Sequence, residues 1–349
     1  MLLPFSWLYR FGIWIFHKLY DLKWRRTYTP GIPTICVGNL SVGGTGKTPM
    51  VEHIVSRLLP STKLAVVSRG YGRKTQGLVW ADEMATAADI GDEPLQFHKK
   101  FPALTVVVAE KRAAAIEALM AQRPETDLII LDDAFQHRAV KASYNLLLTA
   151  YNDLFVNDWY LPAGSLRDLK SSYQRAQSIV VTKCPAQLSL SEKESIERLI
   201  QPLPHQHLFF ASFSYGAPYH LFSGVVMPVQ DMKDGILITG IANPATLVEY
   251  LEQRHVKLDH LSFPDHHEFS GADIERIINR FAQCAFADKI MLTTEKDAMR
   301  LRQWPQLAAF SIFVIPVAHQ ILFSEADQFD RELLNLINAP QQGGRNVDI

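Results

Sequence analysis

The first half of the chain alternates short apolar runs with segments of helical pattern, joined by turns rich in glycine and proline. Residues 34–37 form a β-rich run, and a helical pattern then continues to Leu59. The runs at residues 64–67 and 128–131 are apolar throughout, which is typical of strands in a parallel sheet covered on both faces. This alternation predicts an α/β fold with a parallel sheet.

The second half has a shorter alternation of the same kind. Residues 236–239, 289–293 and 310–317 are strand-like, and residues 271–285 have the helical period. A stretch from 202 to 227 is rich in His, Phe, Ser and Pro and indicates a linker. We therefore expect a second, smaller α/β domain. The predicted boundaries are an amino-terminal helix at 1–29, a first domain at 30–201, a linker at 202–232, a second domain at 233–339 and a loose tail at 340–349.

The first 26 residues differ from the rest of the chain, with eight aromatic residues and a net charge of +4. At about 100° per residue, Arg10, His17 and Asp21 share one sector of a helix. The wide remaining sector is apolar and is centred on Leu8, Phe11, Ile15, Leu19 and Leu22.

This pattern predicts an amphipathic helix in a membrane interface, where its cations are attracted to anionic headgroups. Arg10 and Lys18 interrupt the apolar run, which excludes both a secretory signal and a membrane-spanning helix. A first helix packed on the protein's own core remains the alternative.

Composition excludes several classes of protein. The chain has 349 residues, 48% of them hydrophobic, which excludes a disordered or fibrous protein. Its net charge of −1 disfavours general binding to nucleic acid. Cys36, Cys184 and Cys284 lie far apart, so structural zinc and a disulfide framework are not expected, and a reducing cytoplasm fits.

A glycine-rich loop after residues 34–37 carries the strongest motif. The order of strand, loop and helix is that of a P-loop, in which backbone N–H groups and a helix amino terminus bind phosphates. Lys47 is expected to reach the β and γ phosphates, and the Thr48 hydroxyl to bind Mg²⁺. Ser41 stands where the consensus has its first glycine. The predicted nucleotide-binding residues are Gly43, Gly44, Thr45, Gly46, Lys47 and Thr48.

The apolar run at residues 128–131 ends in Asp132 and Asp133. Carboxylates at the carboxyl end of a buried parallel strand point into the crevice where ligands bind in open α/β sheets. We therefore predict that this pair supplies the second metal-binding element of the nucleotide site.

Further candidates lie in turns that follow the predicted strands, where substrate groups commonly bind. Each is weak alone, because pairs such as Arg-Gly and Gly-Asp are common in solvated turns. They are Arg69, Asp92, Arg112, Gln136, His137 and Arg167.

Taken together and in this order, the motifs VGNLSVGGTGKTP, SRGYGR, GDEP, DDAFQHR, LPAG.LR, GIANP, FPDHH and TTEKDAMR resemble the tetraacyldisaccharide 4'-kinase family of lipid A biosynthesis. The resemblance runs from residue 37 to residue 300. It implies ATP and Mg²⁺ as cofactors and phosphorylation of the 4'-hydroxyl of a tetraacylated disaccharide 1-phosphate, which forms lipid IVA. It also implies a P-loop kinase domain, a smaller domain, and a helix docked on the cytoplasmic face of the bacterial inner membrane.

The resemblance also assigns roles to single residues. Lys47 and Thr48 match the phosphate loop, and Asp132 and Asp133 match the metal-binding pair. Asp92 matches the base that accepts the proton of the sugar hydroxyl. His266 matches the histidine paired with that base, and His267 is an open alternative. The candidate substrate contacts are Arg69, Arg112, Gln136, His137 and Arg167. Ser165 and Asp168 depart from the family motif, which has Pro and Glu there.

Two other functions remain open. A P-loop GTPase or metallochaperone-type switch is faintly suggested by residues 181–184, although the Asp of a guanine-reading loop is missing and Pro185 takes its place. A membrane-attached ATP-binding protein without catalysis is the other.

Overall fold

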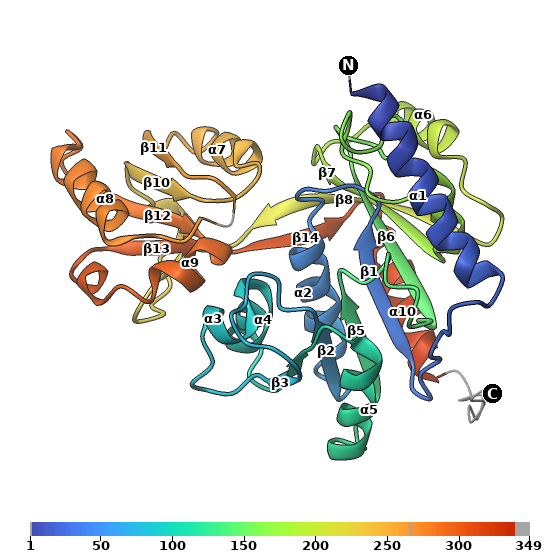
Figure 1. Ribbon diagram of the computed structural model, residues 1–349. Coiled ribbons are helices and arrows are strands. Elements are labelled where there is room, and N and C mark those ends of the chain that lie inside the picture. The colour runs from blue at the N-terminus through green and yellow to red at the C-terminus, as the bar shows by residue number, and fades with distance from the viewer. Residues whose placement is uncertain (1, 266, 339–349) are drawn as a thin grey trace.

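The computed structural model describes residues 2–265 and 267–338. These residues form two lobes, each built on a sheet with helices on both faces (Figure 1). The α/β class predicted from the alternation of strands and helices is confirmed. The predicted loose tail at 340–349 lies outside the described residues.

The first lobe contains a nine-stranded sheet in which the inner strands are parallel and the two edge strands are antiparallel to their neighbours. From edge to edge the strands are β14 (Val317–Ile321), β8 (His207–Tyr215), β7 (Ser178–Cys184), β6 (Tyr144–Ala150), β1 (Thr34–Asn39), β5 (Leu128–Asp132), β2 (Leu64–Ser68), β4 (Thr105–Val108) and β3 (Val79–Trp80).

The register of the central strands brings the two sequence motifs together. β1 and β5 are parallel neighbours, with Val37 opposite Asp132. The glycine loop that follows β1 and the acidic pair that ends β5 therefore lie at the same edge of the sheet, although about 90 residues separate them in the chain.

Helices cover both faces of this sheet with apolar side chains. On one face, Ile54 and Phe329 belong to a buried cluster with side chains of the strands. On the other face, Ile116 and Ile196 belong to a second buried cluster with the strands. Local sequence also sets helix starts, as when Ser189 Oγ accepts from the backbone N–H of Glu192. These helices are α2 (Lys47–Leu58) and α10 (Ala326–Asn338) on one face and α5 (Arg112–Gln122) and α6 (Leu190–Ile200) on the other, with α3 (Ala87–Ile90) and α4 (Asp92–Lys100) towards the second lobe.

The second lobe has a five-stranded sheet that is parallel except for one edge strand. Its core continues into the first lobe, because Ile90 and Leu95 share a buried cluster with Ile236 and Met299. The strands in spatial order are β11 (Leu258–Ser262), β10 (Gly235–Thr239), β12 (Ile290–Thr294), β13 (Ile312–Ile315) and β9 (Tyr219–His220), and the helices are α7 (Ala245–Glu252), α8 (Gly271–Gln283) and α9 (Glu295–Leu301).

The predicted division of the chain needs correction. The expected linker at 202–232 contains β8, a nine-residue strand of the first sheet in which Phe209 and Phe210 are buried. The chain later returns through β14, which pairs antiparallel with β8, so that two adjacent strands join the lobes (Figure 1). The first lobe thus includes α10, which was expected in the second domain. The irregular composition of residues 202–227 concealed the strand.

The amino-terminal segment forms α1 (Leu3–Asp21), which lies against the first lobe (Figure 1). Its buried residues are polar: Ser6 and His17. Most of its large apolar side chains are exposed, with Leu8 69% and Trp7 60% exposed, whereas Phe16 and Leu19 are half-buried. The helix therefore packs on the first lobe chiefly through polar side chains. Among residues 2–265 and 267–338, no helix combines the length and apolarity needed to cross a bilayer.

Candidate active site

The loop between β1 and α2 has the backbone shape that phosphate binding requires. Gly43 and Gly46 have φ angles of 107° and 84°, in the left-handed region that residues with a Cβ rarely adopt. A Cβ on Gly46 would also lie 2.9 Å from Nε2 of His319, which contacts the loop from β14. Gly46 directly precedes α2, which begins with Lys47 and Thr48. The positive end of this helix therefore faces the loop.

The middle of the loop is held from two sides. The Thr45 hydroxyl accepts a hydrogen bond from Asn39 Nδ2 at 2.9 Å, and the Thr45 carbonyl accepts one from Thr182 Oγ1 at 2.7 Å. A Cβ on Gly44 would lie 3.8 Å from Cβ of Ala242, a residue of the second lobe. The second lobe thus reaches the phosphate loop itself.

Asn39, the last residue of β1, organises the basic side chains around the loop. Its Oδ1 accepts from Lys47 Nζ at 3.4 Å and from Arg167 Nη2 at 2.5 Å. The sequence prediction did not assign this residue a role. The available signal was a polar residue that ends a buried strand immediately before a glycine-rich loop.

The two adjacent carboxylates at the end of β5 have different surroundings. Asp132 is buried, and its Oδ2 accepts from Ser68 Oγ at 2.9 Å. Its Oδ1 has no hydrogen-bond partner among the described residues. Burial, reinforced by the carboxylates of Glu93 and Asp133, raises the pKa of Asp132 to about 7.

Asp133, by contrast, is paired with two cations. It contacts Arg167, with Nη1 and Oδ2 3.2 Å apart, and Lys47 Nζ lies 3.7 Å from the same oxygen. Burial alone would raise the pKa of Asp133, but Lys47 and Arg167 outweigh it and lower the pKa below its usual value. Asp133 therefore holds the basic residues, whereas Asp132 keeps one oxygen available.

The predicted substrate contacts gather at the same edge of the sheet. Arg112 Nη2 donates to the backbone carbonyls of Asp132 and Asp133 at 3.5 Å each. Burial, together with the charges of Arg112 and Arg69, lowers the pKa of His137, so these three side chains share one positive region. Gln136, also a predicted contact, donates from Nε2 to the Asn39 carbonyl at 2.7 Å and supports β1.

Asp92 lies where the two lobes meet. It is the first residue of α4, and its Oδ2 is 3.4 Å from Nε of Arg300 on α9. Arg300 is almost fully buried, and it also donates to Asp297 Oδ1 at 3.0 Å and to the carbonyl of His267 at 2.6 Å. The motif TTEKDAMR contains this arginine, but the sequence assigned it no function.

Of the two adjacent histidines, His266 lies outside the described residues. The His267 ring is engaged elsewhere, with Nε2 3.0 Å from Asp273 Oδ2 on α8 and the ring stacked on Phe263. The His267 ring thus has partners of its own, and the pairing of Asp92 with one of the two histidines stays a prediction.

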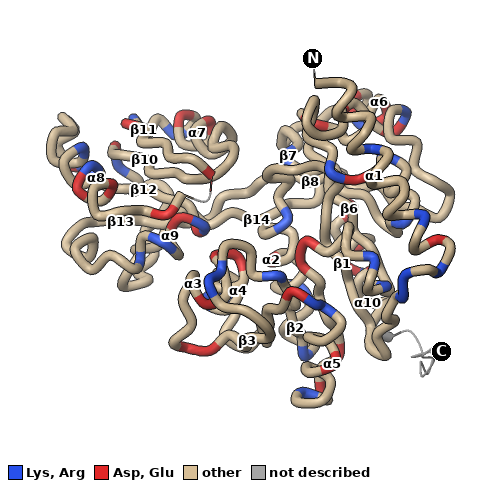
Figure 2. The backbone as a smooth tube through the Cα atoms, in the orientation of Figure 1, with Lys and Arg blue, Asp and Glu red and all other residues tan. Residues whose placement is uncertain are grey.

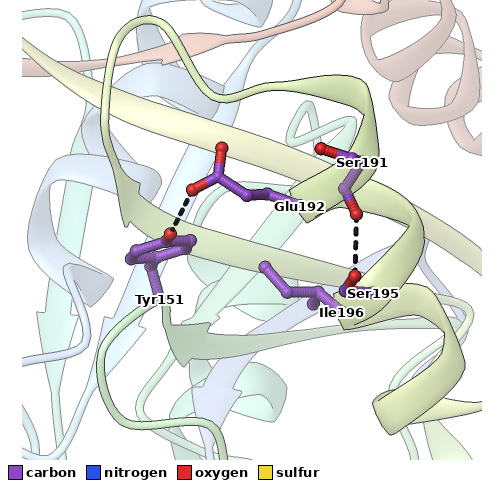
Figure 3. A pocket seen from close by; sticks show the side chains of 5 residues that line it. All are labelled: Tyr151, Ser191, Glu192, Ser195 and Ile196. Atoms are coloured by element: carbon purple, nitrogen blue, oxygen red, sulfur yellow. Dashed lines mark hydrogen bonds between the residues drawn. The ribbon is translucent and has the colours of Figure 1, made fainter.

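A separate open pocket of about 400 Å³ lies beside α6 (Figure 3). Its polar side chains bond to their own surroundings: Tyr151 donates to Glu192 Oε1 at 3.0 Å, and Ser195 donates to the Ser191 carbonyl at 2.8 Å. None of the predicted site residues lines this pocket, so it is not the site that the motifs describe.

Comparison with known proteins gives the family. The LpxK profile, described as tetraacyldisaccharide-1-P 4'-kinase, matches residues 1–338. The chain belongs to this kinase family. The family predicted from the motifs is confirmed, and neither the GTPase-type switch nor a non-catalytic ATP-binding protein gains support.

Relatives match along nearly the whole length. The chain is 40% identical to the tetraacyldisaccharide 4'-kinase of Bacteroides thetaiotaomicron, over 96% of this chain and 92% of that protein. It is also 40% identical to the Porphyromonas gingivalis enzyme of the same name, over 96% of both. The LpxK of Aquifex aeolicus, solved in complex with ATP, superposes with a TM-score of 0.75 at 26% identity, covering 96% of this chain and 98% of that one. The chain is thus a kinase with a P-loop lobe.

Proposed function

We propose that this kinase transfers the γ-phosphoryl group of ATP to the 4'-hydroxyl of a tetraacylated disaccharide 1-phosphate and so forms lipid IVA. The observation that carries the proposal is the position of the first turn of α4. Glu93 lies close enough to Asp132 to raise its pKa, while the adjacent Asp92 contacts Arg300 of the second lobe. A candidate base therefore lies between the nucleotide loop and the other lobe.

In this proposal, the chain's own residues position the reactants and move one proton. Lys47, with the amides of residues 43–48, binds the phosphates and stabilises charge on the transferred group. Asp92 accepts the proton of the sugar hydroxyl, which is a poor nucleophile until that proton leaves. Arg300 orients the Asp92 carboxylate, and His266 is assigned as its second partner. Arg69, Arg112 and His137 supply a positive surface for the phosphorylated substrate.

Thr48 and Asp132 fit a magnesium ion. Asp132 has a buried oxygen without a hydrogen-bond partner among the described residues, next to the helix that carries the Thr48 hydroxyl. Mg²⁺ prefers oxygen ligands and takes its remaining ones from phosphates and water. When bound, the ion would neutralise charge on the phosphates. Asp133 is assigned to Lys47 and Arg167 instead of the metal.

We assign the outward face of α1 to the membrane surface, on the cytoplasmic side of the inner membrane. Phe5, Trp7, Leu8, Phe11 and Trp14 are exposed along one helix. Lys18 lies in the last turn of the helix, and Lys23, Arg25 and Arg26 follow it in the chain. Basic positions gather at this end of α1 (Figure 2) and would attract anionic headgroups. No nucleic acid is expected as a partner.

The membrane assignment predicts that Trp7→Ser with Phe11→Ser lowers sedimentation with anionic vesicles by about tenfold or more, because each buried aromatic contributes roughly 1.5 to 3 kcal/mol. Transfer to detergent-dispersed lipid should stay within about twofold of wild type. Trp304→Ser, which changes a tryptophan of the second lobe, is the control. Unchanged sedimentation of the double variant contradicts the assignment.

The catalytic proposal is tested by incubating the protein with γ-labelled ATP, Mg²⁺ and the disaccharide 1-phosphate in detergent. Label should enter the lipid. Release of labelled inorganic phosphate with no labelled lipid would overturn the proposal.

A further inference from the structure

The polar contacts of α1 converge on one short segment of the first lobe. Ser6 Oγ accepts from the backbone N–H of Ala163 at 3.1 Å, and the Tyr9 hydroxyl donates to the carbonyl of Arg167 at 3.5 Å. His17 Nε2 lies 2.6 Å from Asp168 Oδ1. The helix therefore holds residues 163–168 at several points along its length.

That segment in turn braces the phosphate loop. The backbone N–H of Val42 donates to the carbonyl of Ser165 at 2.7 Å, and that of Arg167 donates to the carbonyl of Leu40 at 2.8 Å. Ser41 and Leu166 form an antiparallel bridge between these bonds. The Arg167 guanidinium continues to Asn39 and Asp133. A shift of residues 165–168 would therefore displace both the start of the phosphate loop and the Arg167 guanidinium that contacts Asn39 and Asp133.

His17 and Asp168 are the buried centre of this arrangement. His17 Nε2 lies 2.6 Å from Asp168 Oδ1, and because a carboxylate oxygen only accepts, Nε2 carries a proton; Arg138 Nη1 lies 3.2 Å from Nδ1 of the same ring. Nε2–H then donates to Asp168, whose side chain is 1% exposed. Burial alone would raise the pKa of Asp168, but His17 and Arg175 outweigh it and lower that pKa. Loss of His17 leaves a buried carboxylate with fewer partners, directly after Arg167 in the chain.

We infer that His17 is a positioning residue of the kinase site: through Asp168 it fixes residues 165–168, and through them Arg167, Asn39 and the phosphate loop. The membrane-facing helix thus also sets the geometry at which ATP binds. This inference rests on the proposed function, since it concerns the same nucleotide site. The contact gives Asp168, which differs from the Glu of the family motif, a partner on α1 in addition to Ser172 and Arg175.

The test compares His17→Leu, which removes the hydrogen bond, with His17→Gln, whose amide can donate from a similar position. His207→Leu is the matched control, because His207 pairs with Glu332 at 2.5 Å, at the opposite end of the strands. With lipid in detergent micelles, His17→Leu should raise KM for ATP about tenfold, while His17→Gln and His207→Leu stay within about twofold of wild type. A purely structural loss would reduce the amount of active enzyme and leave KM unchanged.

Binding of a fluorescent ATP analogue without lipid keeps this inference separate from the proposed function. If the wild type transfers no phosphate to lipid, the catalytic proposal fails, yet His17→Leu should still weaken analogue binding about tenfold. Wild-type affinity in folded His17→Leu would overturn the inference. Equal impairment of His17→Gln and His17→Leu would overturn it as well.

Discussion

The nucleotide half and the acceptor half of the site are assembled in different ways. Lys47 and Arg167 both contact Asp133 at the edge of a single sheet, within one lobe. Asp92, by contrast, contacts Arg300, so the acceptor half is formed between two lobes. The ion pairs of the nucleotide half therefore involve the first lobe alone, although Ala242 of the second lobe lies beside Gly44, whereas the proposed acceptor half needs residues of both lobes. Variants of the two halves should differ in whether ATP binding survives.

Lys47→Ala should have the largest effect. It removes the cation next to Asn39 and Asp133, so both ATP affinity and transfer should fall, with kcat/KM for ATP lower by about a thousandfold. Steady-state kinetics with labelled ATP measure this loss. Lys63→Ala, on the same lobe but bonded through its backbone to Asp127, is the control. A Lys47→Ala protein that keeps wild-type kcat/KM contradicts the assignment of the loop.

Asp92→Asn should affect only the acceptor half. The amide cannot accept the hydroxyl proton, so kcat should fall about a hundredfold or more while ATP affinity stays within about twofold. Single-turnover transfer and equilibrium binding of an ATP analogue separate the two quantities. Equal loss of ATP affinity in Asp92→Asn and Lys47→Ala would remove the distinction between the halves.

Arg300→Gln should lower kcat by about tenfold, because Asp92 loses the guanidinium that orients it and the His267 carbonyl loses its donor. ATP affinity should again be preserved. Arg254→Gln, in the turn after α7 and stacked on Tyr250, is the matched control. If Arg300→Gln changes KM for ATP and leaves kcat intact, Arg300 belongs to the nucleotide half instead.

The smallest effect concerns a strand that joins the halves. His319 of β14 donates from Nε2 to the Gly46 carbonyl at 3.0 Å, and burial lowers its pKa to about 4. In the unfolded chain, His319 binds a proton below about pH 6.5. In the folded chain, it binds that proton only near pH 4. Stability should fall by up to about 3 kcal/mol as pH drops through this window, and the loss should then level off.

Urea unfolding of wild type and His319→Gln between pH 4 and 7 measures this contribution. The variant should lose less stability over the window, since glutamine does not titrate. Parallel pH profiles for the two proteins would show that His319 does not titrate in this way.

The parts of the fold that sequence predicted depend on neighbouring residues. The left-handed glycines before Lys47 and the buried strand ending in Asp132 are local patterns, and both were recognised. β8 was mistaken for a linker because its short apolar run, with the buried Phe209 and Phe210, lies within a segment rich in His, Ser and Pro. The pairs Asn39 with Arg167, Asp92 with Arg300 and His17 with Asp168 join residues more than 100 positions apart. Only the topology brings such residues together, so single-chain patterns could not reveal them.

The helix α1 illustrates the same limit. Its periodicity predicted a polar and an apolar sector around one axis, but periodicity cannot say which sector meets the protein. The hydrogen bonds of Ser6 and His17 decide it, and they depend on partners at residues 163 and 168.

The position of the new phosphate on the lipid shows directly whether the kinase phosphorylates the 4'-hydroxyl. After reaction with ATP, the purified lipid can be examined by ³¹P–¹H correlation, which identifies the carbon that bears each phosphate. We expect a new phosphate monoester coupled to the 4'-proton of the distal sugar, formed by wild type and more slowly, by about a hundredfold or more, by Asp92→Asn. A product phosphorylated elsewhere, or equal formation by Asp92→Asn, would contradict the proposed function.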